Sequence, residues 1–544
     1  MIKCNKNIDL NRILLFICLV IIFIHSFFIF RQKDGLDLDE NASFQLANWT
    51  VVTIPEAISA VKNDNVNEKI NTIEAMRNPN NCWITEQDIM SKYTVQPGER
   101  FAYFSTFLCQ AFDVHPPLFY LVIKTICSLV PSLNLLIVGY IINITFLLLA
   151  CYFIYKIGLI LFDDNSWGAL AAVLYYGLSF DFVNNATFYR MYAILTFWFV
   201  FLLYNTLKWA NDGYADDKKV IRKLCIIEAL AMYTQYFAVF FIFPMFVLNL
   251  VFMIIKKIKI RRYLKYNIIT GLIYLLVWPF SIVHILFTDR GADVKGNLNA
   301  LNIFGRLYEY KDNLFRSIFS GSKKYFLLFA VVAICYIAYR LIKHKFIEKD
   351  VKMWIGSIHF LDIVYVFGSA IAYYVVAAVA APWAIDRYVM PAMPVLSLII
   401  TFIIIQMMSV VIKNKYITSG IMCLLIIALC LHWHQRVQPY YLFNSKDRVE
   451  YKKTCYNYDG VVIDSKTIRL LGDIELNYKH PKLYVTDEVN YYNLDSVLDD
   501  NKTYMVYMNK DIDNDEVIST LESKGFKLVK NDCEADHFYI YTLN

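Results

Sequence analysis

The chain has 544 residues, of which 58% are hydrophobic and only 18% carry a charge. A water-soluble protein of this length needs more polar surface, so the composition predicts a polytopic α-helical membrane protein and excludes an ordinary soluble enzyme. The net charge of +6 is expected to follow the membrane topology and gives no indication of nucleic-acid binding.

The first apolar run covers residues 13–30. At about 1.5 Å per residue it is long enough to cross most of a bilayer core. Lys3, Lys6 and Arg12 precede it, so the positive-inside rule predicts a cytoplasmic N-terminus. The run is longer than the apolar part of a signal peptide and no small-residue cleavage site follows it. We therefore expect a retained anchor.

An acidic stretch, RQKDGLDLDENASFQ at residues 31–45, follows this span. Asp34, Asp37, Asp39 and Glu40 crowd into it directly after the apolar run. Such a stretch can be the solvated end of a membrane helix. It can also supply a catalytic carboxylate at the outer membrane surface, where lipid-borne substrates arrive. The stretch alone leaves both interpretations open.

The polar segment over residues 31–115 is expected to form the first extracytoplasmic loop, with short helices in it. Thr53, two residues before a proline, and Thr85, three residues before Asp88, are typical helix starts. The apolar stretch HPPLFYLVIKTICSLVP at 115–131 is short for a span. It predicts a helix on the membrane surface or a re-entrant helix.

Further apolar runs bring the expected number of spans to about eleven. They cover residues 134–155, 167–183, 190–209, 222–240, 238–255, 267–288, 325–342, 358–380, 389–412 and 416–433. Basic residues gather in every second segment between these spans. They are Lys218, Lys219, Arg222, Lys223, Lys256, Lys257, Lys259, Arg261, Arg262, Lys265, Arg340, Lys343, Lys345, Lys413 and Lys415. All of them are cytoplasmic if the N-terminus is, which predicts an extracytoplasmic C-terminal segment.

From residue 436 onward the composition becomes that of a soluble domain. Strand-like runs at 460–464, 482–486, 503–508 and 537–542 alternate with helical patterns at 465–476, 489–498 and 515–524. This alternation predicts a small α/β domain with a largely parallel sheet. We thus expect a transmembrane domain over 1–435 and an extracytoplasmic α/β domain over 436–544. The latter has no glycine-rich phosphate loop or metal-ligand cluster, which favours a structural or acceptor-guiding role.

Most of the 12 cysteines fall in apolar runs, where they act as small hydrophobic side chains. Cys82 and Cys109 lie in the first loop, and Cys455 and Cys533 lie in the C-terminal domain. Two pairs in extracytoplasmic regions permit two disulfides, which the sequence does not establish.

Polar residues recur at the expected outer ends of the spans: Asp39, Glu40, His115, Asp181, Arg190, Tyr192, Gln235, Tyr236, Asp386, Arg387 and Tyr388. A single polar residue at a helix end is mostly an interface anchor, and an arginine there can reach up to lipid headgroups. Several clusters on one face, with no charge deep in a span, predict a polar cavity at the outer membrane surface.

A family resemblance rests on five sequence elements in this order: DE after the first span, HPPLFYLVIK, YRMYAI, QYFAVFF and DRYVMPAMPVLSLI. Over residues 13 to 412 the chain resembles the membrane-embedded glycosyltransferases of the GT-C fold. Within them it is similar to the bacterial group related to protein mannosyltransferases and aminoarabinose lipid A transferases (glycosyltransferase family 39-like). The resemblance implies transfer of a sugar from a polyprenyl-phosphate-linked donor to an acceptor protein, lipid or envelope glycan at the outer face of the cell membrane.

The resemblance also implies roles for particular residues. The first-loop aspartate of the family corresponds to Asp39, a general base with Glu40 beside it. One base is sufficient, because a polyprenyl phosphate leaves without being protonated at neutral pH. The departing phosphate needs a cation, for which Arg387 is the first choice and Arg190 the second. The substrate-binding residues are completed by His115, Tyr192, Tyr236 and Tyr388.

One element departs from the family pattern. Similar proteins often have an acid two residues before the arginine of the R-M-Y element, where this chain has Phe188. Asp181 is a candidate substitute. A divalent metal ion, bound by His115 with Asp39, is the one cofactor that the resemblance suggests, and the missing acid weakens that expectation.

A transporter or flippase of lipid-linked saccharides is the alternative. It would call for ionisable residues near the middle of the spans and for broken, paired half-helices. The charges expected at the span ends favour the transferase.

Overall fold

The computed structural model describes residues 6–51, 79–300, 302–346, 358–465, 471–499, 501–535 and 537–544. The chain divides into two compact units. Unit 1 contains Met1–Arg31, Asp113–Phe119 and Tyr140–Pro439, and unit 2 contains Gln32–Phe112, Tyr120–Gly139 and Tyr440–Asn544. Unit 2 therefore joins the first loop to the C-terminal segment. The domain bounds of 1–435 and 436–544 stay a prediction.

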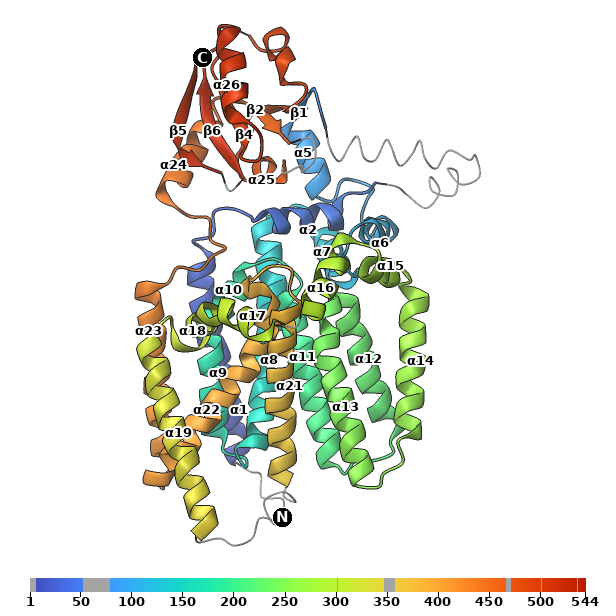
Figure 1. Cartoon of the computed structure of the whole chain (residues 1–544), viewed down its shortest axis with the longest axis vertical. Helices are drawn as coiled ribbons and strands as arrows, with labels where there is room; N and C mark the ends of the chain where they lie inside the picture. The colour runs from blue at the N-terminus through green and yellow to red at the C-terminus, as the bar shows by residue number, and fades with distance from the viewer. Residues whose placement is uncertain are drawn as a thin grey trace. The chain divides into compact units, whose positions relative to one another are not determined.

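Unit 1 is built from helices (Figure 1). They are α1 (Lys6–Phe30), most of α8 (Leu135–Leu161), α9 (Ser166–Gly177), α10 (Phe180–Thr187), α11 (Tyr192–Asn211), α12 (Lys218–Thr234), α13 (Val239–Ile255), α14 (Arg261–Val277), α15 (Phe280–Leu286), α16 (Asp289–Ala300), α17 (Ile303–Glu309), α18 (Lys311–Phe319), α19 (Lys323–Phe346), α21 (Ile358–Ala380), α22 (Met393–Val411) and α23 (Lys415–Arg436). Three short 3₁₀ helices, η1 (Tyr236–Ala238), η2 (Asp386–Tyr388) and η3 (Met390–Ala392), lie between them.

In the described part of the chain, 7 helices are long and apolar enough to cross a membrane, or up to 9 if each of two bent pairs is one span. The expected multi-pass helical membrane protein is confirmed. Two of the expected runs form shorter helices. The run at 167–183 divides after Gly177, because the Ser179 side chain accepts a hydrogen bond from Phe182 N and starts α10. The run at 222–240 overlaps α12, which has 17 residues and ends at Thr234.

The two bent pairs have local causes. α14 and α15 meet at 89°, at Pro279, whose ring cannot continue a regular helix. α18 and α19 meet at 83°, where Ser320 and Gly321 take the left-handed conformation that ends helices. Within unit 1, the short helices α15 to α18 lie across one end of the long helices (Figure 1). This places them at one membrane surface.

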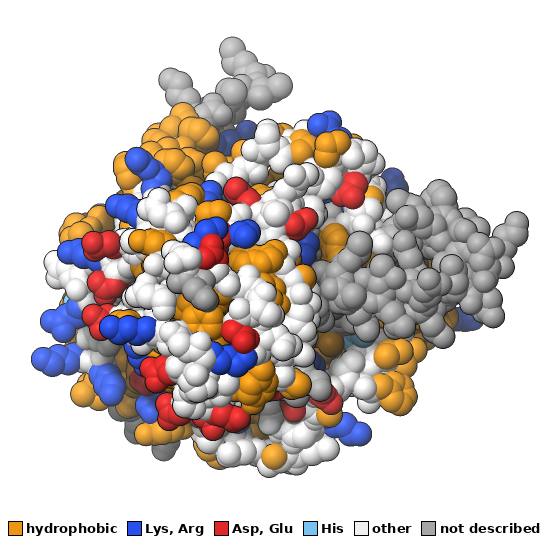
Figure 2. Space-filling model, turned by 90° about the horizontal axis from the view of Figure 1, so that it is seen from above, with side chains coloured by type: hydrophobic (Ala, Val, Ile, Leu, Met, Phe, Trp, Pro, Cys, Tyr) orange, Lys and Arg blue, Asp and Glu red, His pale blue; other side chains and the backbone are white. Residues whose placement is uncertain are grey.

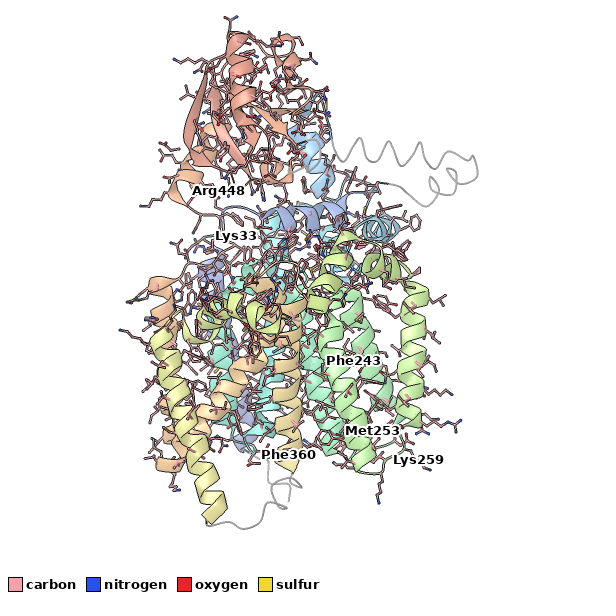
Figure 3. The ribbon with its side chains drawn as sticks, in the orientation of Figure 1. Lys33, Phe243, Met253, Lys259, Phe360 and Arg448 are labelled. Carbon is pink, nitrogen blue, oxygen red and sulfur yellow. The ribbon has the colours of Figure 1, made fainter. Side chains whose placement is uncertain are left out.

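The long helices carry apolar side chains outward. On α13, Phe243 is 62% exposed and Met253 is 2% exposed, so one face packs on the bundle and the other suits lipid (Figure 3). One acid departs from the expectation that charges stay at span ends. Glu228, in the interior of α12, is 7% exposed.

Unit 2 contains helices and one sheet. Its elements are α2 (Leu38–Asn48), β1 (Cys82–Thr85), α5 (Glu86–Tyr93), α6 (Tyr103–Phe112), most of α7 (Leu118–Leu129), α24 (Lys446–Cys455), β2 (Asp459–Asp464), α25 (Gly472–Glu475), β3 (Lys482–Asp487), η4 (Tyr491–Ser496), β4 (Tyr504–Asn509), α26 (Asn514–Ser523), β5 (Leu528–Glu534) and β6 (Phe538–Leu543). The short apolar helix expected within 115–131 is α7. Thr85 caps α5 together with Asp88, as expected, whereas Thr53 lies outside the described residues.

The sheet has the order β1-β3-β2-β4-β6-β5. β3, β2 and β4 are parallel, and the other neighbours are antiparallel, so the sheet is mixed rather than largely parallel. The first-loop strand β1 pairs with β3, and Cys82 lies opposite Val485. The sequence pattern missed β1 because a four-residue strand takes its partner from the far end of the chain. On the face drawn in Figure 2, side chains of both charges are interspersed, as on a water-exposed surface.

Of the two disulfides that the sequence permits, the one between Cys82 and Cys109 is not formed in the structure. The one between Cys455 and Cys533 is not tested. The Cys533 side chain lies outside the described part of the chain.

The acidic stretch after α1 is organised by a buried ion pair within unit 2. Lys33 Nζ lies 3.0 Å from Glu40 Oε2, and both side chains are fully buried. Lys33 also donates to Tyr441 O at 2.5 Å. Glu40 accepts from Asp37 N at 2.7 Å, while Asp37 caps α2. Burial lowers the pKa of Lys33, and the Glu40 carboxylate partly offsets this.

Residues of the C-terminal segment bind the same stretch. Asn477 accepts from Leu36 N at 2.8 Å and donates to Leu36 O at 2.7 Å, so one amide holds both backbone groups. Lys452 lies 3.2 Å from Asp34 Oδ2. Arg448 lies over the Phe443 ring, which Lys33 also approaches at 5.2 Å (Figure 3). The conformation of the stretch therefore depends on residues about four hundred positions away.

Glu40→Gln should destabilise the protein by about 3–5 kcal/mol, because it leaves the buried Lys33 ammonium without a counter-charge. The thermal unfolding temperature of the full chain in detergent measures this. Glu86→Gln, at an exposed carboxylate, is the control and should change stability by less than about 0.5 kcal/mol.

The double variant Lys33→Met, Glu40→Leu removes both charges and should recover part of the loss. If it is no more stable than Glu40→Gln, the ion pair is not the cause of the instability.

Candidate active site

Three polar side chains of unit 1, those of Asp113, His115 and Arg190, form a chain of contacts. His115 Nδ1 lies 2.7 Å from Asp113 Oδ2, and Arg190 Nη2 lies 3.3 Å from His115 Nε2. Arg190 is 5% exposed. His115 precedes the two prolines that lead into α7, where their fixed backbone angles restrict the entry to the helix. The predicted residues His115 and Arg190 are thus brought together, with Asp113 as a third member.

The sequence prediction missed Asp113. Burial alone would raise the pKa of its carboxyl group, but attraction to His115, the hydrogen bond from that ring and the charge of Arg190 outweigh burial and lower the pKa. Asp113 therefore carries a negative charge at neutral pH. The signal in the sequence is its position two residues before the histidine of the HPP element.

The turn between α10 and α11 positions Arg190. Arg190 N donates to Phe188 O at 2.8 Å, and the Asn143 side chain donates to the same oxygen at 2.6 Å and to Asn185 O at 3.0 Å. Asn143 comes from α8, so a buried amide fixes the turn from a neighbouring helix. The turn also sets the direction of Phe188, the residue that replaces the family's acid.

Phe188 belongs to an aromatic group around Arg387. The Arg387 guanidinium lies 6.0 Å from the centre of the Phe188 ring and 5.4 Å from that of Tyr388. Tyr192 stacks on Phe188 at 6.1 Å and meets Tyr388 edge-on at 6.2 Å. The predicted residues Arg387, Tyr388 and Tyr192 therefore lie together. A guanidinium among aromatic faces is held there by cation–π attraction, and its planar fork of N–H donors is of the kind that binds phosphate and carboxylate groups.

Two further arginines approach the same turn. Arg290 of α16 lies 4.2 Å from the centre of the Trp383 ring, and Arg387 lies 6.0 Å from it. Arg306 of α17 donates to Ala378 O at 3.2 Å and also to Ala381 O. The short helices α16 and α17 thus bring positive charge to the turn before η2. The sequence analysis missed both arginines because these helices lie in a run between expected spans.

Tyr236 adds a hydroxyl group to this region. Trp278 Nε1 donates to its oxygen at 2.9 Å, and the same oxygen lies 2.8 Å from His284 Nδ1. The next residue, Phe237, has its ring 5.2 Å from Tyr388. Tyr236 is therefore fixed next to the aromatic group, as a binding residue would be.

Asp181 does not take the place of the missing acid beside Arg190. It lies buried in α10, where Ser317 Oγ is 3.5 Å from its Oδ1. Asp386 is equally buried and accepts from Asn184 Nδ2 at 2.6 Å. The acid that meets Arg190 through His115 is Asp113.

Asp39 and Glu40 belong to unit 2. Asp39 lies half-buried in the first turn of α2, where its backbone N donates to Asp37 Oδ1 at 2.8 Å and its O accepts from Ser43 at 2.8 Å. A carboxylate in this turn is favoured by the helix dipole. Glu40 pairs with Lys33 and completes the cap of α2. Catalytic roles for Asp39 and Glu40 stay predictions.

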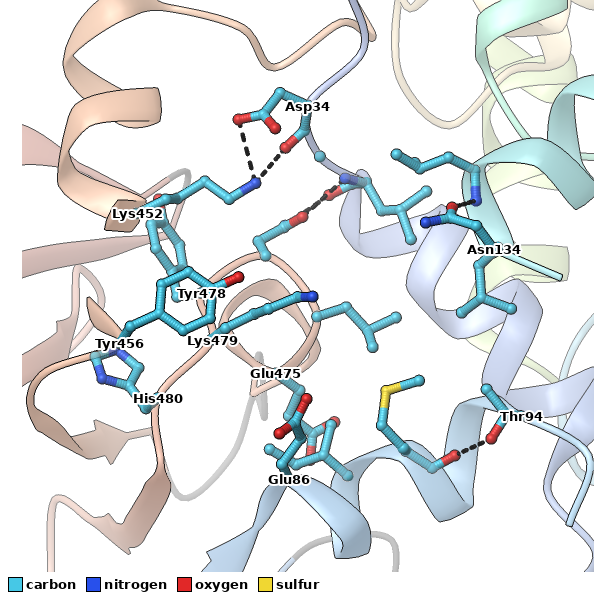
Figure 4. Close-up of a pocket in the computed structure, with 18 of the residues that line it drawn as sticks. Asp34, Glu86, Thr94, Asn134, Lys452, Tyr456, Glu475, Tyr478, Lys479 and His480 are labelled. Atoms are coloured by element: carbon cyan, nitrogen blue, oxygen red, sulfur yellow. Dashed lines mark hydrogen bonds and ion pairs between the residues drawn. The ribbon is translucent and has the colours of Figure 1, made fainter. Parts of the chain in front are cut away.

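A cavity of about 720 Å³ lies in unit 2 (Figure 4). Its lining combines carboxylates with basic and aromatic side chains, among them Asp34, Glu475, Lys452, Lys479, Tyr456 and His480. Asn477, which holds Leu36, also lines it. The sequence analysis did not anticipate this cavity.

The residues described in unit 1 offer no set of three His, Cys, Asp or Glu ligand atoms at His115. A divalent ion at His115 and Asp39 stays a prediction.

No protein-family model matches the sequence, and no curated protein sequence matches it. Solved structures of ArnT from Cupriavidus metallidurans are similar to this chain. The structure in the apo state is 10% identical over 78% of this chain and 87% of that chain, with a TM-score of 0.47. The structure bound to undecaprenyl phosphate is 11% identical over 97% of each chain, with a TM-score of 0.49. At these values the likenesses alone decide neither the fold nor the function.

Asp113 should make stability depend on pH in the acid range. Its pKa is lower in the folded state than in the unfolded state. Its contribution to the free energy of unfolding is therefore full above the unfolded-state pKa of about 3.9, and it is lost as the pH falls through the folded-state pKa. The unfolding temperatures of wild type and Asp113→Asn should differ most near pH 7 and converge at acid pH.

Asp212→Asn, at an exposed carboxylate after α11, is the matched control and should follow wild type. A difference between Asp113→Asn and wild type that stays constant down to acid pH would contradict the role of the charge.

Proposed function

We propose that this protein is a GT-C-type glycosyltransferase that moves a sugar from a polyprenyl-phosphate-linked donor to an acceptor protein, lipid or envelope glycan. In this proposal the N-terminus is cytoplasmic, and the reaction occurs at the outer face of the cell membrane. The observation that carries the proposal is the group of aromatic rings around Arg387, formed by Phe188, Trp383 and Tyr388. Arg290 also lies over the Trp383 ring. Guanidinium groups beside a membrane surface suit a lipid phosphate.

In the proposed sugar transfer, the charge of each side chain decides its role. The acceptor hydroxyl gives its proton to the Asp39 carboxylate while its oxygen forms a bond to the anomeric carbon of the donor. The bond from that carbon to the phosphate oxygen breaks, and its electron pair leaves with the polyprenyl phosphate. Arg387 meets the negative charge that develops there. Arg190, oriented by His115 and Asp113, supplies a second positive charge.

Aromatic side chains supply the remaining binding surface. Tyr192, Tyr388 and Tyr236 present faces and hydroxyl groups, which suit both a sugar ring and the first units of a polyprenyl chain. Arg290 and Arg387 both lie over the Trp383 ring, so both guanidinium groups are near one turn. A bound divalent ion would add Lewis-acid stabilisation of the phosphate, whereas the arginines stabilise its negative charge by electrostatic attraction and hydrogen bonds.

Asp39→Asn should reduce transfer by about 10²–10⁴-fold, because the amide cannot take the acceptor proton. The assay follows labelled sugar from a panel of polyprenyl-phosphate sugars into an acceptor extract of the source membranes, with purified protein in detergent. Asp34→Asn changes a neighbouring carboxylate of the same stretch and should retain most of the activity. Equal turnover by Asp39→Asn and wild type would refute the base assignment.

Arg387→Ala should weaken binding of labelled polyprenyl phosphate at least ~10-fold and reduce transfer by about 10²–10³-fold. Arg387→Lys should restore only part of both, because lysine lacks the forked donors. Lys295→Ala, at an exposed basic residue of α16, controls for general charge loss. Unchanged lipid binding by Arg387→Ala would remove this arginine from the phosphate site.

A flippase of lipid-linked saccharides is the second candidate. The buried Glu228 within α12 and the bent pairs α14–α15 and α18–α19 are features of the kind that a transporter uses. In unit 1, however, the short partners of both pairs lie across the end of the long helices, and do not form opposed half-helices (Figure 1). Net movement of labelled lipid across vesicles without sugar transfer would favour this candidate.

A further inference from the structure

Two helices of unit 1 bring together three side chains that ligate metals in proteins. His25 comes from α1, and Cys430 and His434 come from α23. One ligand atom of each lies within 4.8 Å of the others. His25 Nε2 is 2.7 Å from His434 Nε2 and 3.8 Å from Cys430 Sγ. Among the described residues this is the one such group of three.

The spacing of Cys430 and His434 along α23 brings two of the three side chains together. Residues four positions apart lie on the same face of a helix, so Cys430 and His434 project together. Trp433 fixes the register of this turn. Its Nε1 donates to Leu178 O at 2.9 Å, and its ring meets that of His25 edge-on at 5.9 Å. The His25 ring is thus directed towards the two α23 side chains.

The distances are close to those of a tetrahedral site. Zn–N bonds of about 2.0–2.1 Å and a Zn–S bond of about 2.3 Å imply separations of about 3.3 Å between two nitrogens and about 3.6 Å between nitrogen and sulfur. In the structure the two nitrogens are closer than this, at 2.7 Å, and the nitrogen and the sulfur are slightly farther apart, at 3.8 Å. Small side-chain rotations of two imidazole rings and one thiol convert the contact into a ligand set.

We propose that His25, Cys430 and His434 bind a transition-metal ion of the zinc class, with a fourth position open to water. Imidazole and thiolate ligands select such ions over magnesium or calcium. Binding uses two neutral imidazoles and one thiolate, so the Cys430 thiol releases one proton as the metal binds. His434 lies in the last turn of α23 and is exposed, which gives the ion a route from water.

The site would act as a clip. His25 lies near the C-terminal end of α1, and His434 lies near that of α23. The chain leaves unit 1 shortly after each of these ends. A metal bound between the helices would hold these two exit points at a fixed separation. The role is structural, and it is independent of the proposed sugar transfer.

The test uses the full chain, purified in detergent, stripped with a chelator and titrated with Co²⁺. Wild type should bind one equivalent with a thiolate-to-cobalt charge-transfer band, and added Zn²⁺ should abolish the band. Cys430→Ser should lose the band. His25→Gln and His434→Gln should lose or strongly weaken binding at this site. An ion bound near His115 would not produce the band, because no sulfur lies among the ligands proposed there.

Cys423→Ser and His432→Gln are matched controls on the same helix and should behave as wild type. Zn²⁺ should also raise the unfolding temperature of wild type and of both controls, but not that of Cys430→Ser. His434→Gln, at an exposed position, supplies the test if Cys430→Ser does not fold. A wild type without the charge-transfer band, or a band that persists in Cys430→Ser, overturns the proposal and leaves only a histidine–histidine hydrogen bond.

Discussion

The buried pair of Lys33 and Glu40 is the constraint on which the conformation of the stretch after α1 depends. Two charges removed from water are tolerated only if each has its counter-charge and its hydrogen bonds satisfied, and here the surrounding chain does this. The Tyr441 carbonyl and the cap of α2 complete the arrangement. The candidate base Asp39 lies directly before Glu40, so its place in α2 is set by a pair that takes no part in the proposed chemistry.

Much of the architecture follows from local patterns. Long apolar runs form helices in a bilayer, and the strands β2, β3, β4 and β6 appear where short apolar runs indicated them. β1 and β5 were missed. β1 is four residues long and depends on β3 for its partner, and β5 carries the polar run KNDCE, which has no strand signal. Tertiary pairing decided both elements.

The candidate site was predictable in part. His115, Arg190, Tyr192, Tyr236, Arg387 and Tyr388 come from elements that end together in unit 1, and their motifs were visible. Asp113 lies two residues before His115, and the sequence analysis did not recognise this spacing as a sign of their 2.7 Å contact. Arg290 reaches the site from α16, in a run read as a loop between spans. The cap and the ion pair of Glu40 were likewise not predicted, because Lys33 and Glu40 are brought together by the fold of the stretch.

The place of β1 in the sheet has a consequence for biosynthesis. Thr85 pairs with Lys482, so the edge strand of the sheet leaves the ribosome roughly 400 residues before its partner. At ~5–20 residues per second this delay is about 20–80 s. During that time β1 lacks its hydrogen-bonded partner β3, and Lys33 lacks the Tyr441 carbonyl that accepts its hydrogen bond. Unit 2 can close only after the last helix of unit 1 has been inserted, so membrane insertion precedes the completion of this unit.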